Sequence, residues 1–367
     1  MNRSGSPENM EKLYRMPAEW ENHSATQLHW PANRETWPGD RLERVEIVYA
    51  EIISVLHRYE PVLLLVNTVE DRKRAESILK KFDPDIDLNR IHFHIVPLND
   101  VWARDCGPVF IKRRSDTLTT VPEYAITNWI YNAWGQKYPP FDSDNKIPEW
   151  FADHFSIYMF SPDMVLEGGA IDTNGKGVLL TTESVLLNPN RNPQLTKAEI
   201  GKKLKRYLGM EKIIWLKKGL AGDDTDGHID DLSRFLNENT ILTMICEDEN
   251  DVNYAALNEN LDILRKSTDP NGNPFQILTL PMPKTRIEGS TVDGSEYVPA
   301  SYANFYIANG VVLVPLYDER YDQAAIDLMS RFFPGRDIVG IECSDLVWGQ
   351  GSIHCITQQL YGLENLG

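Results

Sequence analysis

The chain has 367 residues, of which 42% are hydrophobic and 25% are charged. These values are typical of a globular protein and exclude a disordered or collagen-like chain. Asp and Glu number 54 and Lys and Arg number 37, so the formal net charge is −17. An acidic chain of this kind is not expected to bind nucleic acid or an anionic membrane surface, whereas a cationic ligand would be attracted to it.

The apolar segments are too short for a transmembrane helix, which needs about 18 consecutive apolar residues. Residues 1–17 lack the apolar core of a signal peptide, so we expect a cytoplasmic protein. The four cysteines include no Cys-x-x-Cys pair, which argues against a disulfide scaffold and a structural zinc site. We therefore expect free thiols, and any of them could be a nucleophile.

The first predicted elements follow a β-α-β order. Apolar residues recur every three or four positions across 40–59, which predicts a helix. The apolar run 62–66 predicts a buried strand, 69–82 a charged helix and 92–97 an alternating strand.

The middle of the chain predicts a hairpin and a capped helix. Strands at 164–171 and 178–182 are joined by a turn that contains Asn174-Gly175. Thr196 and Glu199 form a capping box for a helix over 196–208. Further strands are expected at 212–216, 241–246, 304–307 and 311–316, and further helices at 253–266 and 323–333. These elements predict a mixed α/β fold with many short strands and no evident sequence repeat.

Residues 222–231 form the densest polar cluster, with five aspartates and His228. One interpretation is a solvated acidic loop. A calcium loop is excluded, because the EF-hand pattern would place Gly222 and Ser233 at the ends where acidic ligands are required. A metal site through His228, Asp230 and Asp105 remains open, although no HExxH-type ligand pair accompanies it.

A second cluster, 99–108, follows a predicted strand, where α/β folds often place ligand sites. It contains Trp102 and Asp105. Trp102 could instead be a core residue, and Asp105 could pair with Arg104 or cap a turn.

Two further segments offer a carboxylate and a thiol. Glu167 precedes two glycines, which suggests an inward carboxylate or, alternatively, a residue exposed on an edge strand. Cys355 follows a glycine-containing loop, which suggests an accessible thiol, although most such cysteines are small buried hydrophobic residues. We assign Cys246 and Cys343 to the core.

Together these segments provide a thiol, a histidine and several carboxylates. Clustered carboxylates repel one another unless a cation is present, and a planar guanidinium can pair with two of them. A cysteine thiolate could then attack the guanidinium carbon. This indicates a thiol hydrolase of a cationic substrate; a metal-dependent hydrolase and a non-catalytic polyamine-binding protein remain as alternatives.

Segments along nearly the whole chain resemble the bacterial agmatine deiminases and peptidyl-arginine deiminases of the guanidine-modifying pentein superfamily. The matching segments are MPAEWENHSATQLHWP from Met16, NDVWARDCGP from Asn99, YNAWGQKYPP from Tyr131, LEGG from Leu166, LLTTESVLLNPNRNP from Leu179, GDDTDGHIDDLSRF from Gly222, SYANFYIANG from Ser301 and GQGSIHCITQQ from Gly349. The sequence departs from the family pattern at Gln350 and Ser352, where Gly and Asn are frequent, and at 184–185, where Glu-Cys is common.

The resemblance implies the fold and its organisation. Residues 1–367 would form a single catalytic domain, a pentein-type five-bladed α/β propeller with pseudo-fivefold repeats of ββαβ-like units. The active site would lie in its central channel. The resemblance also makes a homo-oligomer plausible and implies that no metal or organic cofactor is needed.

The resemblance further implies that five residues carry the reaction. Asp105 and Asp230 would bind the guanidinium, and the Cys355 thiolate would attack its carbon. His228 would act as general acid and then as general base, with Glu167 orienting it. The expected reaction converts agmatine to N-carbamoylputrescine and ammonia, a step in polyamine biosynthesis towards putrescine.

Trp102 and Trp134 would line the substrate-binding site. The substrate tail is less constrained by the sequence. Free arginine carries a carboxylate that calls for an arginine in the site, whereas agmatine ends in an amine that suits an acidic mouth. The acidic composition favours agmatine, with peptidyl-arginine and free arginine as alternatives.

Overall fold

The computed structural model describes residues 10–115, 120–283, 294 and 297–367. The chain divides into two compact units. The first unit comprises Met1–Glu21, Asp105–Leu220 and Thr225–Thr279, and the second comprises Asn22–Arg104, Ala221–Asp224 and Leu280–Gly367. The single domain over 1–367 stays a prediction.

The described strands form five small sheets that repeat one connection pattern. In the first unit, β5 (Val109–Arg113) and β6 (Tyr124–Thr127) are antiparallel, and β7 (Tyr158–Phe160) then joins β6 in parallel after α6 (Ile147–His154). Strand β1 (Tyr14–Arg15) extends this sheet along β5. The pattern is therefore ββαβ.

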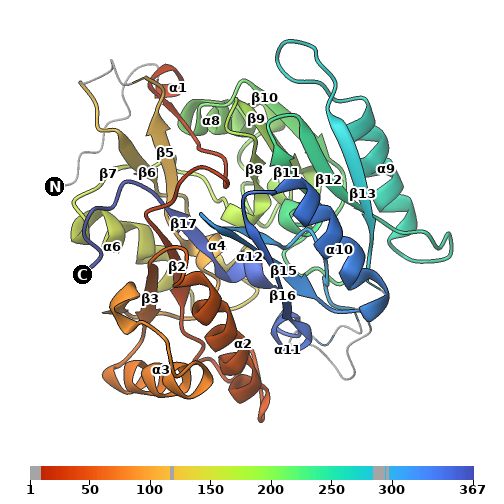
Figure 1. Ribbon diagram of the computed structural model, residues 1–367. Helices are drawn as coiled ribbons and strands as arrows, with labels where there is room; N and C mark the ends of the chain where they lie inside the picture. Colours follow the sequence, from red (N-terminus) through yellow and green to blue (C-terminus); the bar gives the residue numbers. More distant parts are fainter. Residues whose placement is uncertain (1–9, 116–119, 284–293, 295–296) are drawn as a thin grey trace. The chain divides into compact units, whose positions relative to one another are not determined.

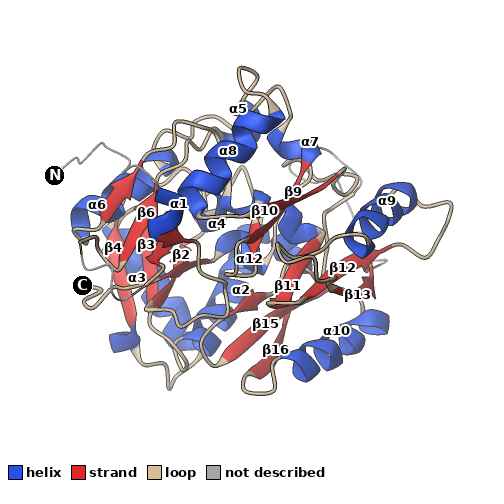
Figure 2. Cartoon of the chain, turned by 90° about the horizontal axis from the view of Figure 1, so that it is seen from above, coloured by secondary structure: helices blue, strands red, loops and turns tan. Residues whose placement is uncertain are grey.

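The same pattern recurs twice more along the first unit. Antiparallel strands β8 (Asp172–Thr173) and β9 (Val178–Thr182) are followed by α8 (Lys197–Leu208) and by β10 (Lys212–Leu216), which is parallel to β9. Antiparallel strands β11 (Ser233–Asn237) and β12 (Thr240–Ile245) are followed by α9 (Tyr254–Arg265) and β13 (Gln276–Pro281). Helix α9 packs against β12 (Figure 2).

The second unit holds the other two sheets. Strand β14 (Tyr306–Ile307) is antiparallel to β15 (Val311–Leu316), and β16 (Asp337–Glu342) is parallel to it after α10 (Glu319–Phe332). Helix α10 lies along β15 and β16 (Figure 1).

The last sheet joins the two ends of the described chain. Strand β17 (Gln358–Leu360) is antiparallel to β2 (Ala25–His29), which is followed by α2 (Arg41–Leu56) and the parallel strand β3 (Val62–Val66). Helix α3 (Val69–Phe82) then leads to β4 (Ile91–Ile95). The five sheets confirm the predicted α/β class and its ββαβ-like units.

Several short helices occupy the connections. They are α1 (Met10–Leu13), α4 (Ala103–Cys106), α5 (Ala133–Gln136), α7 (Glu183–Leu186), α11 (Ser344–Val347), α12 (Ile353–Ile356), and the 3₁₀ turns η1 (Leu88–Arg90), η2 (Asp144–Lys146), η3 (Gly168–Ala170) and η4 (Ile229–Asp231). Five of them, α4, α5, η3, η4 and α12, carry or border the candidate site residues.

Most of the long elements begin and end where the sequence predicts. Strand β3 is buried at every position, as its uninterrupted apolar run predicts for a strand between two parallel neighbours. Helix α8 begins at the predicted capping box, because Thr196 accepts from the Glu199 N–H and the Glu199 side chain accepts from the Thr196 N–H. Gly209 ends it in the left-handed conformation.

Two expectations are wrong. No strand spans 164–171, because Gly168 and Gly169 turn the backbone into η3, and the strand that pairs antiparallel with β9 is β8. Cys246 is not a core residue but is partly exposed just beyond β12, whereas Cys343 is buried as expected. Among the described residues, none of the helices is both long and apolar enough to span a membrane.

Candidate active site

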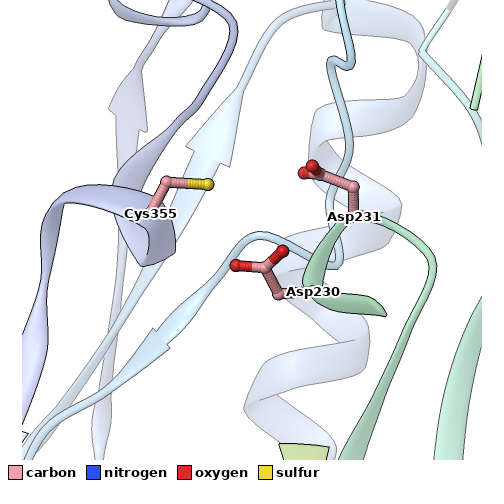
Figure 3. A group of neighbouring side chains, drawn as sticks. All are labelled: Asp230, Asp231 and Cys355. Carbon is pink, nitrogen blue, oxygen red and sulfur yellow. The ribbon is translucent and has the colours of Figure 1, made fainter. Parts of the chain in front are cut away.

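Four of the predicted catalytic residues belong to the first unit and are buried there. Asp105 lies on α4, Glu167 directly precedes η3, and His228 directly precedes η4 on which Asp230 lies. Their exposed fractions are 5% for Asp105, 0% for Glu167, 1% for His228 and 0% for Asp230. Asp231 follows on the same turn and is also buried (Figure 3). The acidic segment is therefore not the solvated loop of the alternative interpretation.

Asp105 is held by N–H donors on both carboxylate oxygens. Its Oδ1 accepts from the Gly169 N–H at 2.9 Å, and its Oδ2 accepts from Trp134 Nε1 at 2.9 Å. His228 Nδ1 lies 3.7 Å from Oδ1 of Asp105 and 4.0 Å from Oδ1 of Asp230. The first unit thus brings a histidine and two carboxylates together, as the sequence predicts.

The charged groups of this cluster shift the pKa of Asp105 in opposite directions. The pKa of Asp105 is raised to about 6, chiefly by burial and with smaller contributions from the carboxylates of Asp230 and Glu167, while His228 and the Trp134 N–H oppose the rise. A buried cluster with this balance gains stability when a cation binds to it. Asp105, His228 and Asp230 each offer a nitrogen or oxygen donor, so the alternative of a metal site stays a prediction.

Gly169 permits this close packing. A Cβ atom at position 169 would lie 2.5 Å from Nδ1 of His228 and 2.8 Å from Oδ1 of Asp105. These distances are shorter than van der Waals contact, so any side chain would displace the two catalytic candidates. The double glycine that ends the predicted strand therefore has a packing function in the site.

We expect Gly169→Ala to lower kcat/KM by about 100-fold, because a displacement of about 1 Å at reacting groups has effects of that order. Gly201→Ala is the matched control, since its Cβ would lie 3.7 Å from Ile213 and make only ordinary contact. Steady-state kinetics of both variants, with melting temperatures, test this. A Gly169→Ala enzyme with the activity of the Gly201→Ala enzyme would contradict it.

Trp134 reaches Asp105 from a left-handed turn. Ala133, Trp134 and Gln136 have φ values of 49°, 54° and 65°, a conformation that costs roughly 1–2 kcal/mol per non-glycine residue. The Asn132 side chain supports the turn by accepting from the Gly135 N–H at 2.9 Å. Strain of this kind persists where neighbouring contacts enforce it, and here it directs the indole N–H to a catalytic candidate.

Glu167 forms a buried ion pair with Arg191. The Nε of Arg191 donates to Oε1 of Glu167 at 2.6 Å, and both side chains are fully buried. The extended residue before η3 is thus an inward carboxylate, and the alternative of an exposed edge strand is wrong. The sequence did not identify this partner of Glu167.

Cys355 belongs to the second unit, where it lies on α12 (Figure 3) and is 5% exposed. Asn304 Nδ2 donates to its Sγ at 3.2 Å, and Asn304 Oδ1 accepts from the His354 N–H at 2.9 Å. Because a backbone N–H can only donate, it fixes which end of the amide faces the sulfur. Asn304 was missed by the sequence reasoning, although it lies within the quoted segment 301–310.

Trp102 packs on the loop that precedes Cys355. A Cβ atom at Gly351 would lie 2.4 Å from Cζ3 of Trp102 and 3.0 Å from Cβ of Cys355. The Trp102 ring also lies 5.9 Å from that of Trp37. Trp102 is therefore a buried residue, as the core alternative states, and it is also a neighbour of the candidate nucleophile, as the site hypothesis requires.

The arginines beside the motifs make internal contacts. In the second unit Arg104 donates from Nε to the His354 carbonyl at 3.2 Å and from Nη1 to Oε1 of Gln359 at 2.7 Å. Arg191 pairs with Glu167 and Asp226 in the first unit. The carboxylate of Asp105 accepts hydrogen bonds from Gly169 and Trp134 rather than from Arg104, so the alternative that Asp105 pairs with Arg104 finds no support.

Each unit thus presents part of the predicted site. The first unit holds Asp105, Glu167, His228, Asp230 and Trp134, and the second holds Cys355 and Trp102. Asn304 went unrecognised in the sequence, as did the partners that Gly169 and Arg191 have in the structure. Their position inside the quoted segments was the available signal.

Comparisons with known proteins identify the family of this chain. The sequence profile of the Porphyromonas-type peptidyl-arginine deiminases matches residues 15–360. The chain is 36% identical to the agmatine deiminase of Medicago truncatula over 370 residues, which covers 94% of this chain and 96% of the relative. These matches span almost the whole of both proteins.

Solved structures share the fold. The agmatine deiminase of Enterococcus faecalis superimposes with a TM-score of 0.86 at 31% identity, covering 97% of this chain and 98% of the other. A variant of the C. jejuni agmatine deiminase with substrate bound has a TM-score of 0.82 at 32% identity, covering 95% and 97%. The predicted pentein-type α/β fold is confirmed, and this protein belongs to the Porphyromonas-type peptidyl-arginine deiminase family of guanidine-modifying hydrolases.

Proposed function

We propose that the protein hydrolyses agmatine to N-carbamoylputrescine and ammonia. The observation that carries this proposal is the buried cluster of Asp105, Asp230 and His228, whose mutually repelling carboxylates suit a cationic guanidinium. The relatives described above carry the name agmatine deiminase, and one of them was crystallised with substrate bound. The acidic net charge of −17 would also attract a dication such as agmatine.

The reaction begins at the thiol. Asp105 and Asp230 accept hydrogen bonds from the guanidinium N–H groups, and the Cys355 thiolate attacks the central carbon. A free thiol has a pKa of about 8.5, so the thiolate needs stabilisation. The bound guanidinium supplies positive charge, and the Asn304 amide donates a hydrogen bond to Sγ.

His228 carries the protons. Attack of sulfur gives a tetrahedral intermediate, to whose leaving nitrogen His228 donates a proton; the C–N bond breaks and ammonia departs. His228 then takes a proton from water, whose oxygen attacks the thiouronium carbon. The C–S bond breaks and restores the thiolate, the new hydroxyl group releases its proton to solvent, where it converts the ammonia to ammonium, and the neutral ureido product leaves. One water is consumed for each ammonia released, and Glu167 orients His228 throughout.

The tail of the substrate distinguishes agmatine from arginine. A substrate carboxylate would require an arginine side chain whose guanidinium is available. Arg104 and Arg191, the arginines beside the motifs, are already engaged with Gln359 and the His354 carbonyl and with Glu167 and Asp226. Their engagement favours agmatine over free arginine.

The deciding experiment compares three substrates side by side. We expect ammonia and a ureido product from agmatine, and at least 100-fold lower kcat/KM with free arginine, whose carboxylate would be unmatched, and with a blocked peptidyl-arginine, which lacks the terminal amine of agmatine. Preference for either arginine substrate would keep the chemistry and overturn the substrate assignment.

Loss of activity after exhaustive chelation, restored by metal, would favour the metal-dependent alternative. No turnover by the folded protein would favour the polyamine-binding alternative.

We expect kcat/KM to fall about tenfold per pH unit below an acid limb near pH 6. Asp105 must be ionised to bind a guanidinium, and burial raises its pKa to about 6, so the binding form is lost as pH falls through that value. The acid limb of kcat should lie at a lower pH than that of kcat/KM, because the bound guanidinium stabilises the ionised form of Asp105.

Trp134→Phe provides the matched test of this assignment. It removes the N–H that Asp105 accepts, a contact that lowers the pKa of Asp105, so the acid limb of kcat/KM should move to higher pH. A pH–rate profile of the wild type and Trp134→Phe measures both limbs. An unchanged limb in Trp134→Phe would assign it to another group.

Further expectations belong to the same proposal. Because the mechanism needs residues of both units, we propose that 1–367 act as one catalytic domain without a cofactor. We also propose a cytoplasmic homo-oligomer. Light scattering of the purified protein measures its oligomeric state, and a monomer at assay concentration with full activity would contradict the oligomer.

A further inference from the structure

We propose that Arg191 is a positioning residue of the active site, which holds Glu167 and the segment 225–228 in the arrangement that His228 needs for proton transfer. The inference rests on the proposed function and adds to it a residue that touches none of the reacting atoms. It follows from the contacts of one buried guanidinium, from the free oxygen of Glu167 and from the charge of the cluster.

The Arg191 guanidinium donates in three directions. Its Nε donates to Oε1 of Glu167 at 2.6 Å, its Nη1 to Oδ2 of Asp226 at 2.6 Å, and its Nη2 to the carbonyl of Thr225 at 2.8 Å. The guanidinium is planar, so these contacts fix the position of Glu167 relative to residues 225 and 226. The Arg191 side chain is fully buried, which excludes competing water.

Glu167 is left with one oxygen for another partner. Its Oε1 is taken by Arg191, whereas its Oε2 is buried and has no hydrogen-bond partner among the described residues. A buried carboxylate oxygen without a donor is costly unless a donor arrives. An imidazole or guanidinium N–H would supply one, which is what the proposed role of Glu167 requires.

The segment that leads to His228 depends on the same arginine. The Thr225 carbonyl accepts a hydrogen bond from Arg191, and Thr225 Oγ1 accepts one from the His228 N–H at 3.2 Å. Asp226 has a φ of 73° and Gly227 a φ of 114°, so the backbone between them is strained at the aspartate. Contacts from Arg191, Lys137 and Asn190 to the Asp226 carboxylate hold that strained residue.

The charge of Arg191 also matters to the cluster. Without the guanidinium, Glu167 would be a buried carboxylate with no cation, and such a group takes up a proton. Protonated Glu167 would no longer stabilise an imidazolium at His228. Removal of Arg191 should therefore resemble Glu167→Gln in its effect on His228, although Arg191 does not act on the substrate.

A purely structural ion pair would behave differently. Its loss would lower the melting temperature, leave kcat of the remaining folded protein unchanged, and add to the effect of any catalytic substitution. A positioning role predicts instead a fall in kcat with little change in KM, and non-additivity with Glu167. A double-mutant cycle separates the two.

The test uses Arg191→Lys, Arg191→Met, Glu167→Gln and the double variant Arg191→Met/Glu167→Gln. We expect kcat to fall about tenfold in Arg191→Lys, which keeps the charge, and about 100-fold in Arg191→Met, with KM within about twofold. The double variant should lose no more than Glu167→Gln alone. It also removes both partners of the buried pair, so it should fold even where Arg191→Met does not.

Arg74→Met is the matched control. It removes a guanidinium that pairs with Glu46 through Nε and Nη2 on the second unit, and kcat should stay within about twofold of the wild type. Unchanged kcat in both Arg191 variants, or strictly additive losses with Glu167→Gln, would overturn the proposal.

A second readout does not depend on turnover. NMR of histidine-labelled protein, with the His228 signal among eight histidines identified by its absence in His228→Asn, measures the titration midpoint of that ring. The midpoint should move to lower pH in both Arg191→Met and Glu167→Gln. If the midpoint shifts in both variants but the wild type turns over no guanidine substrate, the proposed function is refuted and the positioning role of Arg191 is kept. If the midpoint does not shift but the wild type is active, the positioning role is refuted and the proposed function is kept.

Discussion

Cys355→Ala is expected to lower kcat for agmatine by at least about 10⁴-fold, because removal of a covalent nucleophile removes the pathway through the enzyme-bound intermediate. Binding should persist, since Asp105 and Asp230 remain. Ammonia release measures the first effect and calorimetric titration with agmatine the second. In the wild type, acid quenching during turnover should trap a covalent adduct on the peptide that contains Cys355.

Cys246→Ala is the control for this prediction. Cys246 is a partly exposed cysteine beyond β12 that forms no disulfide, so its removal should leave kcat unchanged within about twofold. Substantial activity in Cys355→Ala would remove the thiol mechanism and leave the metal-dependent alternative. Loss of activity in Cys246→Ala instead would move the nucleophile to that residue.

Asn304→Asp is expected to lower kcat/KM at pH 7 by about 100-fold, because a carboxylate would face the sulfur where the amide N–H now donates to it. The side chain keeps its shape and its acceptor for the His354 N–H, so the fold should be retained. The thiolate would form only at higher pH, since two adjacent negative charges repel.

The rate of alkylation of Cys355 by iodoacetamide as a function of pH measures this effect without any substrate. Its midpoint should rise by about 1–2 pH units in Asn304→Asp. Asn260→Asp is the matched control: this buried asparagine accepts from the Lys217 N–H and donates to the Lys218 carbonyl, away from any thiol. An unchanged alkylation midpoint in Asn304→Asp would show that the amide does not stabilise the thiolate.

Local elements were predictable wherever one short-range interaction dominates. The apolar run of β3, the capping box of α8 and the glycine that ends this helix occur in the structure where the sequence places them. The strand expected at 164–171 failed for the opposite reason. Its apolar residues indicate burial, but burial does not specify an extended backbone, and the two glycines allow η3 instead.

The sequence by itself determined the globular composition, the α/β class and, through the ordered motifs, the family and its candidate residues. Only the tertiary structure decided which partner each buried polar group has. Arg191 and Glu167 are 24 residues apart, and Asn304 and Cys355 are 51 apart. These pairings depend on how the chain folds, because each buried donor bonds to whichever acceptor lies beside it in the folded protein. No periodicity in the sequence encodes which residues become neighbours in this way.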